Sequence, residues 1–329
     1  MGERRLRPFF RRMVTERPCA TYPPERSGFV RSRPHAADPG FRRLAASPAL
    51  EAPETVDRRG RRWFYRHPLV IRLAHWINAA VLLVLLMSGL QIFNAHPALY
   101  WGATSTFDNP ALAITSDQRS DGTNRGIVTI GAHTIDTTGV LGLSKERGTE
   151  VERAFPSWAT LPANQDLATG RRWHFLFAWF LVINGAVYLL YGLFSGQLRR
   201  RLIPDGDQIR DFGGSIKEHL LLRFPEGTEA KRYNVIQKLT YLVLVLGLLP
   251  AMVLAGLAMS PGMDAAWPWL TELFGGRQSA RSVHFIAAGL IVLFVVVHVL
   301  LVIVSGLVNN MRGMITGWFS LGRDRETAR

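Results

Sequence analysis

Long apolar runs separated by strongly polar segments dominate the pattern of positions along this chain. Four of these runs are long enough, and poor enough in charged side chains, to cross a membrane as helices. The pattern predicts an all-α membrane protein, a four-helix transmembrane bundle. A proline within the third run, Pro250, predicts a kink that leaves the carbonyl of Leu246 free. The four predicted spans cover about residues 70–93, 173–194, 239–259 and 283–308.

Two histidines stand out in the last run, where the only other polar side chain is Ser305. Polar side chains at membrane depth are costly and usually functional. His284 and His298 are 14 residues apart; at about 100° per residue they share a helix face and lie about 21 Å apart along the axis. This separation is too large for one metal ion, so each histidine needs a partner on another helix.

Haem b is the cofactor that accepts one imidazole from each of two helices in apolar surroundings. The single cysteine, Cys19, excludes a disulfide framework, a cysteine-ligated iron–sulfur cluster and covalent haem attachment through a C-x-x-C-H motif. Two simpler interpretations stay open at this point. The histidines can hydrogen-bond across a helix bundle, or they can line a proton path.

The N-terminal segment differs in composition from the rest of the chain. Residues 1–66 contain 16 arginines and 7 acidic residues, so they carry +9 of the net charge of +14, and they lack a sustained apolar pattern. Such a composition predicts a disordered basic tail, which we assign to residues 1–62. A cytoplasmic tail explains this charge more simply than a nucleic-acid-binding arm, so we expect no nucleic-acid partner.

The distribution of basic residues predicts the orientation in the membrane. The segment between spans 2 and 3, residues 196–232, has eight basic residues, whereas the long segment between spans 1 and 2, residues 94–170, has 5 basic and 8 acidic residues. The positive-inside rule then places both termini, including a short tail at 321–329, in the cytoplasm. The 94–170 segment becomes a long outer loop.

This orientation pairs the four membrane histidines by depth. His75 lies near the start of span 1, at the cytoplasmic face, and His298 lies in the cytoplasmic half of span 4, so both are on the cytoplasmic side. His174 and His284 open spans 2 and 4, so both lie on the outer side. The sequence therefore predicts two bis-histidine sites for two haems b, with these four residues as the iron ligands.

Arginines precede three of these histidines by one helical turn: Arg72, Arg171 and Arg281. Because haem b carries two propionates and arginine binds carboxylates well, we predict that these arginines pair with the propionates. Positive-inside anchoring is an equal alternative for Arg72. Arg172 and Arg277 are possible substitutes.

Several short motifs resemble the bacterial cytochrome b561 superfamily. They include RLAHW at 72–76, GRRWHF at 170–175, RYNVIQK at 232–238, SPGMD at 260–264 and GGRQSARSVHF at 275–285. Over residues 63–320 the chain is most similar to thiosulfate-reductase-type cytochrome b subunits, the membrane anchors of molybdenum oxidoreductases. The cytochrome b subunits of formate dehydrogenases and nickel–iron hydrogenases are wider relatives.

The resemblance implies a subunit of the bacterial inner membrane that carries electrons between the quinone pool and a periplasmic oxidoreductase, expected to depend on molybdopterin. The four histidines match the family's haem ligands. Asn234 and Gln237, at the start of span 3, match its quinone region, although capping of the helix end explains them equally well. The outer loop contains Trp101 and Trp158 and would suit docking of a soluble partner.

Two other functions remain open on the sequence. One is a self-contained haem reductase of a small molecule or metal ion, which would expose its outer haem to that acceptor. The other is a haem-free transporter or sensor that uses the histidines as a proton relay.

Overall fold

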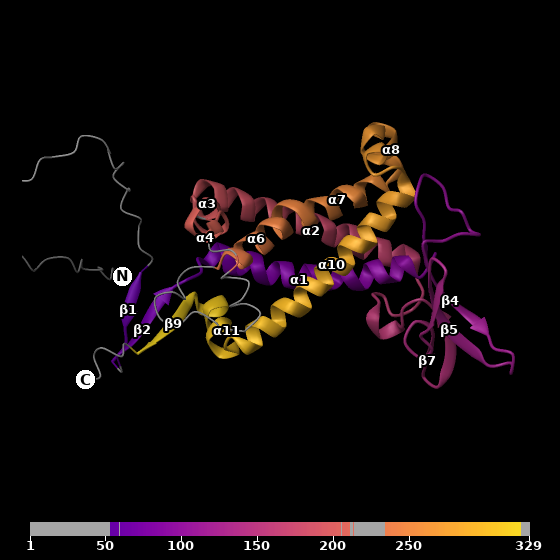
Figure 1. Ribbon diagram of the computed structural model, residues 1–329, viewed down its shortest axis with the longest axis horizontal. Helices are drawn as coiled ribbons and strands as arrows, with labels where there is room; N and C mark the ends of the chain where they lie inside the picture. The colour runs from indigo at the N-terminus through magenta and orange to yellow at the C-terminus, as the bar shows by residue number, and fades with distance from the viewer. Residues whose placement is uncertain (1–52, 59, 205, 211–212, 214–233, 324–329) are drawn as a thin grey trace, which may run out of the picture. The chain divides into compact units, whose positions relative to one another are not determined.

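The computed structural model describes residues 53–58, 60–204, 206–210, 213 and 234–323 (Figure 1). The predicted tail therefore lies outside the described residues, except for residues 53–58 and 60–62. Within the described ranges, four helices are long and apolar enough to cross a membrane, which confirms the four predicted spans. The predicted all-α architecture is wrong outside these spans, because β-strands form at both ends of the bundle.

Local signals in the sequence set the limits of the long helices. The side chain of Asp166 caps the start of the second helix by accepting a hydrogen bond from the Thr169 amide at 3.0 Å. Gly276, with a φ of 113°, precedes the fourth helix. The first, second and fourth long helices are α1 (Leu69–Phe93), α2 (Leu167–Phe194) and α10 (Arg277–Val304).

The third span is continuous but irregular, and it covers Val235–Ala258. A single π-helical segment, η3 (Leu244–Leu248), joins α6 (Val235–Val243) to α7 (Leu249–Ala258). Pro250 lies in the first turn of α7, where its missing N–H is tolerated. The predicted disturbance at this proline therefore takes the form of a π-bulge in the preceding turn.

The long helices pack as two close pairs. One pair is α1 with α2, and the other is α7 with α10; the two pairs approach each other much less closely. Small residues, including the fully buried Ala255, Ala258 and Ala280, let α7 and α10 come together. This arrangement matters because the four histidines lie on α1, α2 and α10, between the two pairs.

The segment predicted as a long loop folds into a small β-domain, which we define as residues 98–153. It contains a four-stranded antiparallel sheet in the order β3-β4-β5-β6 and a β7-β8 hairpin. Its core joins the bundle, because Leu99, Ile114 and Val128 pack in one cluster with Phe93 of α1 and contact Phe285 of α10. The strands are β3 (Ala98–Leu99), β4 (Leu112–Gln118), β5 (Asn124–Ile130), β6 (His133–Asp136), β7 (Gly142–Glu146) and β8 (Thr149–Arg153).

At the other end of α1, a three-stranded sheet joins distant parts of the chain. Its order is β1 (Glu54–Val56), β2 (Arg61–Tyr65) and β9 (Trp318–Arg323), all antiparallel (Figure 1). Residues 53–62, which the sequence assigns to the disordered tail, therefore contain β1 and the start of β2. Residues 321–323, which the sequence assigns to the C-terminal tail, belong to β9.

Short helices complete the described chain. Span 4 ends at Val304, earlier than predicted, because Gly306 adopts a left-handed conformation and starts a separate helix. These short elements are η1 (Ser157–Ala159), α3 (Gln197–Leu202), α4 (Gly206–Arg210), α8 (Pro261–Ala266), α9 (Pro268–Leu273) and α11 (Leu307–Thr316).

Candidate functional site

The structure brings the four membrane histidines together in two pairs. The first pair is His75 of α1 with His298 of α10, whose ring centroids are 6.3 Å apart. The second pair is His174 of α2 with His284 of α10, at 6.1 Å. These are the pairs that the sequence predicts, and they lie at opposite ends of α10.

The spacing within each pair fits two ligands of one iron atom. A metal–imidazole bond of roughly 2.0–2.1 Å, plus about 1.1 Å from nitrogen to ring centre, separates two rings on opposite sides of one metal by about 6.3 Å. The described residues contain no cluster of three or more His, Cys, Asp or Glu side chains that could hold a metal. Two histidines alone suit haem, because the porphyrin supplies the other four ligands.

Hydrogen bonds orient both rings of the second pair. The Nδ1 atom of His174 lies 3.1 Å from the carbonyl oxygen of Leu85 on α1. The Nδ1 atom of His284 lies 2.9 Å from the carbonyl oxygen of Met252 on α7. A carbonyl only accepts, so each Nδ1 carries the proton and each Nε2 keeps a free lone pair. This is the tautomer that a metal ligand requires.

A glycine lies beside each ring of the second pair, four residues after the carbonyl that holds it. A Cβ atom built on Gly89 would lie 3.3 Å from Cε1 of His174, and one built on Gly256 would lie 3.3 Å from Cε1 of His284. Both contacts are tighter than usual. In the structure, Gly89 makes room for the His174 ring and Gly256 for the His284 ring.

The first pair has different surroundings. The Nδ1 atom of His75 is buried and has no hydrogen-bond partner in the described part of the chain. The ring of His298 stacks on Phe294 at 5.7 Å with an interplanar angle of 15°. Near His75, the buried Asn184 side chain of α2 donates to the carbonyl of Ala74 and to Asn78.

In the described part of the chain, the three predicted propionate ligands contact carbonyl oxygens or an aromatic ring. Arg72 donates to the carbonyl of Ile315 at the end of α11, and Arg281 donates to the carbonyl of His96. The guanidinium of Arg171 lies 5.5 Å from the ring centre of Phe175 on its own helix. Within the described ranges none of these arginines forms an ion pair with a carboxylate. Their role toward haem stays a prediction.

The two predicted quinone residues form a helix cap. Asn234 caps α6 by accepting from the Ile236 amide at 3.1 Å, and the Gln237 side chain accepts from the Asn234 amide at 3.4 Å. This is the capping alternative considered for the sequence, and it leaves both side-chain NH₂ groups available. Residues 214–233, directly before this cap, lie outside the described ranges, so a quinone site here stays a prediction.

The β-domain is attached firmly to the helices around the second pair. The fully buried guanidinium of Arg153 donates to Glu146 at 3.0 Å, to Gln91 of α1 at 3.2 Å and to Thr160 at 2.8 Å. The Asn94 side chain, just after α1, makes a reciprocal pair of hydrogen bonds with the backbone of Phe155. The sequence does not reveal the contacts of Arg153 with Gln91 and of Asn94 with Phe155, because the partners are about 60 residues apart in the chain.

Contacts at the start of α10 hold the loop that follows β3. The Gly102 carbonyl accepts from the amides of Gln278 and Ser279, and the Ser279 hydroxyl accepts from the Gly102 amide at 2.7 Å. The carbonyl therefore satisfies N–H groups that the first turn of α10 leaves without helical partners. The ring of His96 stacks on Tyr100. Burial, and then the charge of Arg281, lowers the pKa of His96.

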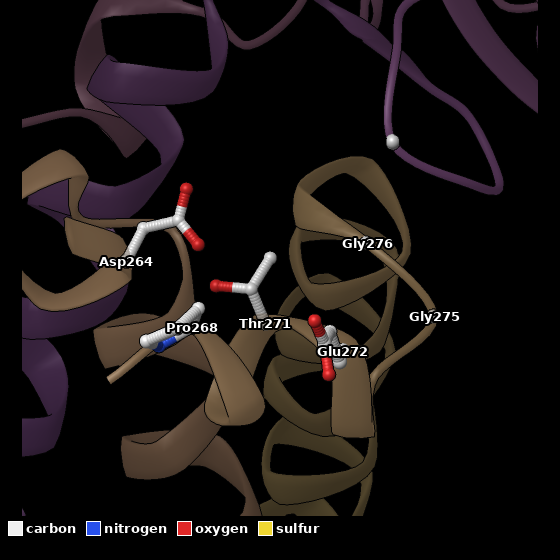
Figure 2. A pocket seen from close by; sticks show the side chains of 7 residues that line it. Asp264, Pro268, Thr271, Glu272, Gly275 and Gly276 are labelled. Atoms are coloured by element: carbon white, nitrogen blue, oxygen red, sulfur yellow. The ribbon is translucent and has the colours of Figure 1, made fainter. Parts of the chain in front are cut away.

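A pocket of about 420 Å³ opens beside this loop (Figure 2). It is separate from both histidine pairs. The carboxylates of Asp264 and Glu272 line it, and Arg277 lies 3.9 Å from Asp264. The complete lining is Ala103, Asp264, Pro268, Thr271, Glu272, Gly275 and Gly276.

Four apolar helices with two histidine pairs between them define a multi-pass membrane protein of the electron-transfer type. The profile of the prokaryotic cytochrome b561 family matches residues 66–317, so the chain belongs to that family. Membership implies haem b and confirms the resemblance at the level of the family. The finer similarity to thiosulfate-reductase-type subunits stays a prediction.

A curated relative points to a more specific comparison. The chain is 26% identical over 238 residues to the putative protein-methionine-sulfoxide reductase subunit YedZ1 of Azospira oryzae. The match covers 72% of this chain and 89% of the relative. The search of solved structures found no match.

Proposed function

We propose that this chain is a di-haem cytochrome b subunit that carries electrons through the membrane between the quinone pool and a soluble oxidoreductase. The observation that carries the proposal is the pair of histidine sites at opposite ends of α10, each with the ring spacing of two ligands on one iron. Bound haem would supply reversible one-electron transfer at each end. His75 with His298 would hold one haem, and His174 with His284 the other.

The protein's own groups would prepare the second site before haem enters. The Leu85 and Met252 carbonyls fix the Nδ1 protons, and so leave both Nε2 atoms unprotonated, as a ligand of haem iron would need. Gly89 and Gly256 let the rings approach their helices closely. Arg171 and Arg281 would neutralise propionates at this end, and Arg72 at the other.

We place both termini in the cytoplasm of a bacterial cell and the β-domain in the periplasm. The charge bias of the connecting segments supports this orientation. The quinone would exchange electrons at the first pair, near Asn234 and Gln237. The partner would dock on the β-domain side, where Trp101, Phe107 and Trp158 are 58%, 73% and 77% exposed.

A protein-methionine-sulfoxide reductase is the first candidate for the soluble partner. The name of the Azospira oryzae relative suggests it, and a molybdopterin-dependent enzyme agrees with the resemblance seen in the sequence. A self-contained reductase of a small molecule or metal ion is the alternative. It predicts rapid haem reoxidation by that acceptor without a second protein.

The test uses purified protein in lipid vesicles with a short-chain quinol as the electron donor. We expect quinol to reduce both haems of the wild type and the haem retained by His284→Ala. The haem retained by His298→Ala should stay oxidised, because the quinol-side haem is missing. Reduction of the His298→Ala haem at the wild-type rate would contradict the proposal that electrons from quinol enter at the first histidine pair. Addition of the reductase and a methionine-sulfoxide peptide should then reoxidise the wild-type haems.

A further inference from the structure

The hydroxyl group of Ser88 distinguishes His174 from the other three membrane histidines. Ser88 lies on α1 and is fully buried. Its Oγ atom is 3.1 Å from Nδ1 of His174, 2.7 Å from the carbonyl oxygen of Val84 and 3.2 Å from that of Leu85. His174 thus has two oxygen atoms near the same ring nitrogen, whereas the corresponding contact of His284 is the Met252 carbonyl.

The proton arrangement follows from these distances. A serine hydroxyl has one proton, and its shortest contact is with the Val84 carbonyl, so Ser88 donates there. Toward His174 the Ser88 oxygen then acts as an acceptor. The Nδ1–H of His174 is shared between Ser88 and the Leu85 carbonyl, both at 3.1 Å. Donation to Val84 polarises the Ser88 oxygen and strengthens it as an acceptor.

An acceptor at Nδ1 makes the opposite nitrogen a stronger electron donor to a metal. Partners of this kind orient a metal-bound histidine and raise its basicity. A more basic ligand favours ferric over ferrous iron, and hydrogen bonding around the ligands is one of the ways in which a protein tunes haem potential. His75 lacks any such partner in the described chain.

We propose that Ser88 is a positioning residue that lowers the reduction potential of the haem bound by His174 and His284. It acts through the imidazole of His174 and does not contact the iron. The Leu85 carbonyl alone is sufficient to hold the tautomer, so the hydroxyl adjusts the potential without being needed for haem binding. The inference rests on the di-haem function proposed above.

The experiment compares Ser88→Ala with Ser305→Ala in the purified full-length protein. Ser305 is a matched control, because its hydroxyl also bonds back to a carbonyl four residues earlier, that of Leu301, but contacts no histidine. Midpoint potentials come from spectroelectrochemical titration, and the electron paramagnetic resonance of the ferric form reports ligand basicity. His298→Ala, which leaves only the second haem, identifies which potential belongs to it.

We expect Ser88→Ala to retain two haems and to raise the midpoint potential of the second haem alone, with an altered ferric resonance signal. Ser88→Cys, which keeps a weak acceptor, should give a smaller shift. Ser305→Ala should change neither potential. Unchanged potentials in Ser88→Ala, equal shifts in both serine variants, or loss of the second haem would each overturn the role of Ser88. Absence of haem from the wild type would instead overturn the proposed function.

Discussion

The two ends of the bundle hold their histidine pairs in different ways. Around His174 and His284, main-chain carbonyls orient both rings, and each ring packs closely against a glycine of a neighbouring helix. Around His75, the Nδ1 atom has no hydrogen-bond partner within the described residues, and His298 is held by ring stacking. If haem binds between the rings of each pair as proposed, the second site is ordered before haem binds, whereas the first depends more on the haem for its geometry.

The two ends of the bundle also differ in what is attached to them, because the β-domain lies only at the end with the second pair. Arg153 and Asn94 tie it to the end of α1, and Gly102 ties its loop to the start of α10. At the other end, Arg72 and Trp76 of α1 donate to carbonyls of α11, whose chain leads into β9. We therefore expect the second pair to be the more rigid and the more resistant to haem loss.

Replacement of a ligand tests the pairing with the largest expected effect. His75→Ala and His298→Ala should each remove the same haem, and His174→Ala and His284→Ala should each remove the other, because one iron needs both rings. Extracted haem per chain and the spectrum of the remaining haem provide the measurement. Spectrally different products from His75→Ala and His298→Ala would show that these two residues serve separate haems.

Removal of the Arg153 guanidinium should weaken the β-domain end selectively. Arg153→Ala leaves the buried side chain of Gln91 without its donor and leaves the Glu146 carboxylate with the Ser157 amide but no cation, which we expect to cost roughly 2–4 kcal/mol in unfolding free energy. Thermal unfolding and proteolysis of the 94–166 segment measure the loss. Arg125→Ala, which breaks the exposed pair with Asp117, is the control and should change little. Equal destabilisation by both variants would argue against a special role for the Arg153 hydrogen bonds.

A methyl group beside His284 should disturb the second site only. Because the added Cβ of Gly256→Ala would lie 3.3 Å from the ring, we expect a cost of about 1–3 kcal/mol, or a roughly 5- to 150-fold weaker haem affinity. Gly289→Ala on α10 is the matched control, since nothing lies within 4 Å of its added Cβ. Competition with apomyoglobin for haem measures both variants. The close approach at Gly256 is irrelevant to haem if the two variants behave alike.

The smallest expected effect concerns acid stability of the β-domain. Hydrogen bonds from Thr138, together with Arg119, lower the pKa of Asp136 from 3.8 to about 2. A carboxyl group with a depressed pKa stabilises the fold above its unfolded pKa, and this contribution is lost as the pH falls from about 4 to about 2. Asp136→Asn should therefore slightly flatten the pH dependence of β-domain unfolding in that range. Identical acid transitions by tryptophan fluorescence would contradict this.

Much of the membrane part follows from the sequence because its signals are local. Apolar run length predicts the four helices, and the spacing of His284 and His298 places them on one helix face with partners elsewhere. Charge bias then predicts which histidines meet. The exact ends of span 4 depend on the positive φ angles of Gly276 and Gly306, which the length of the apolar run does not reveal.

The rest depends on contacts between distant segments. The sequence does not indicate the β-domain, because its strands are short and carry many polar residues, and Phe93 and Phe285 of the helices complete its core. The carbonyls of Leu85 and Met252 leave no sequence signal, since any residue supplies a carbonyl. The combination of a carbonyl and a glycine four residues later occurs at both rings, but leucine, methionine and glycine are too common in membrane helices to reveal it.

The central claim is that the chain holds two haems, each between two histidines. The most direct test is a reduced-minus-oxidised spectrum of the purified protein, with the haem extracted and counted per chain. We predict a b-type spectrum and two haems per chain, falling to one in His298→Ala and in His284→Ala. A single haem in the wild type would contradict the two-site account. Absence of haem would favour the alternative in which the four histidines form a proton relay.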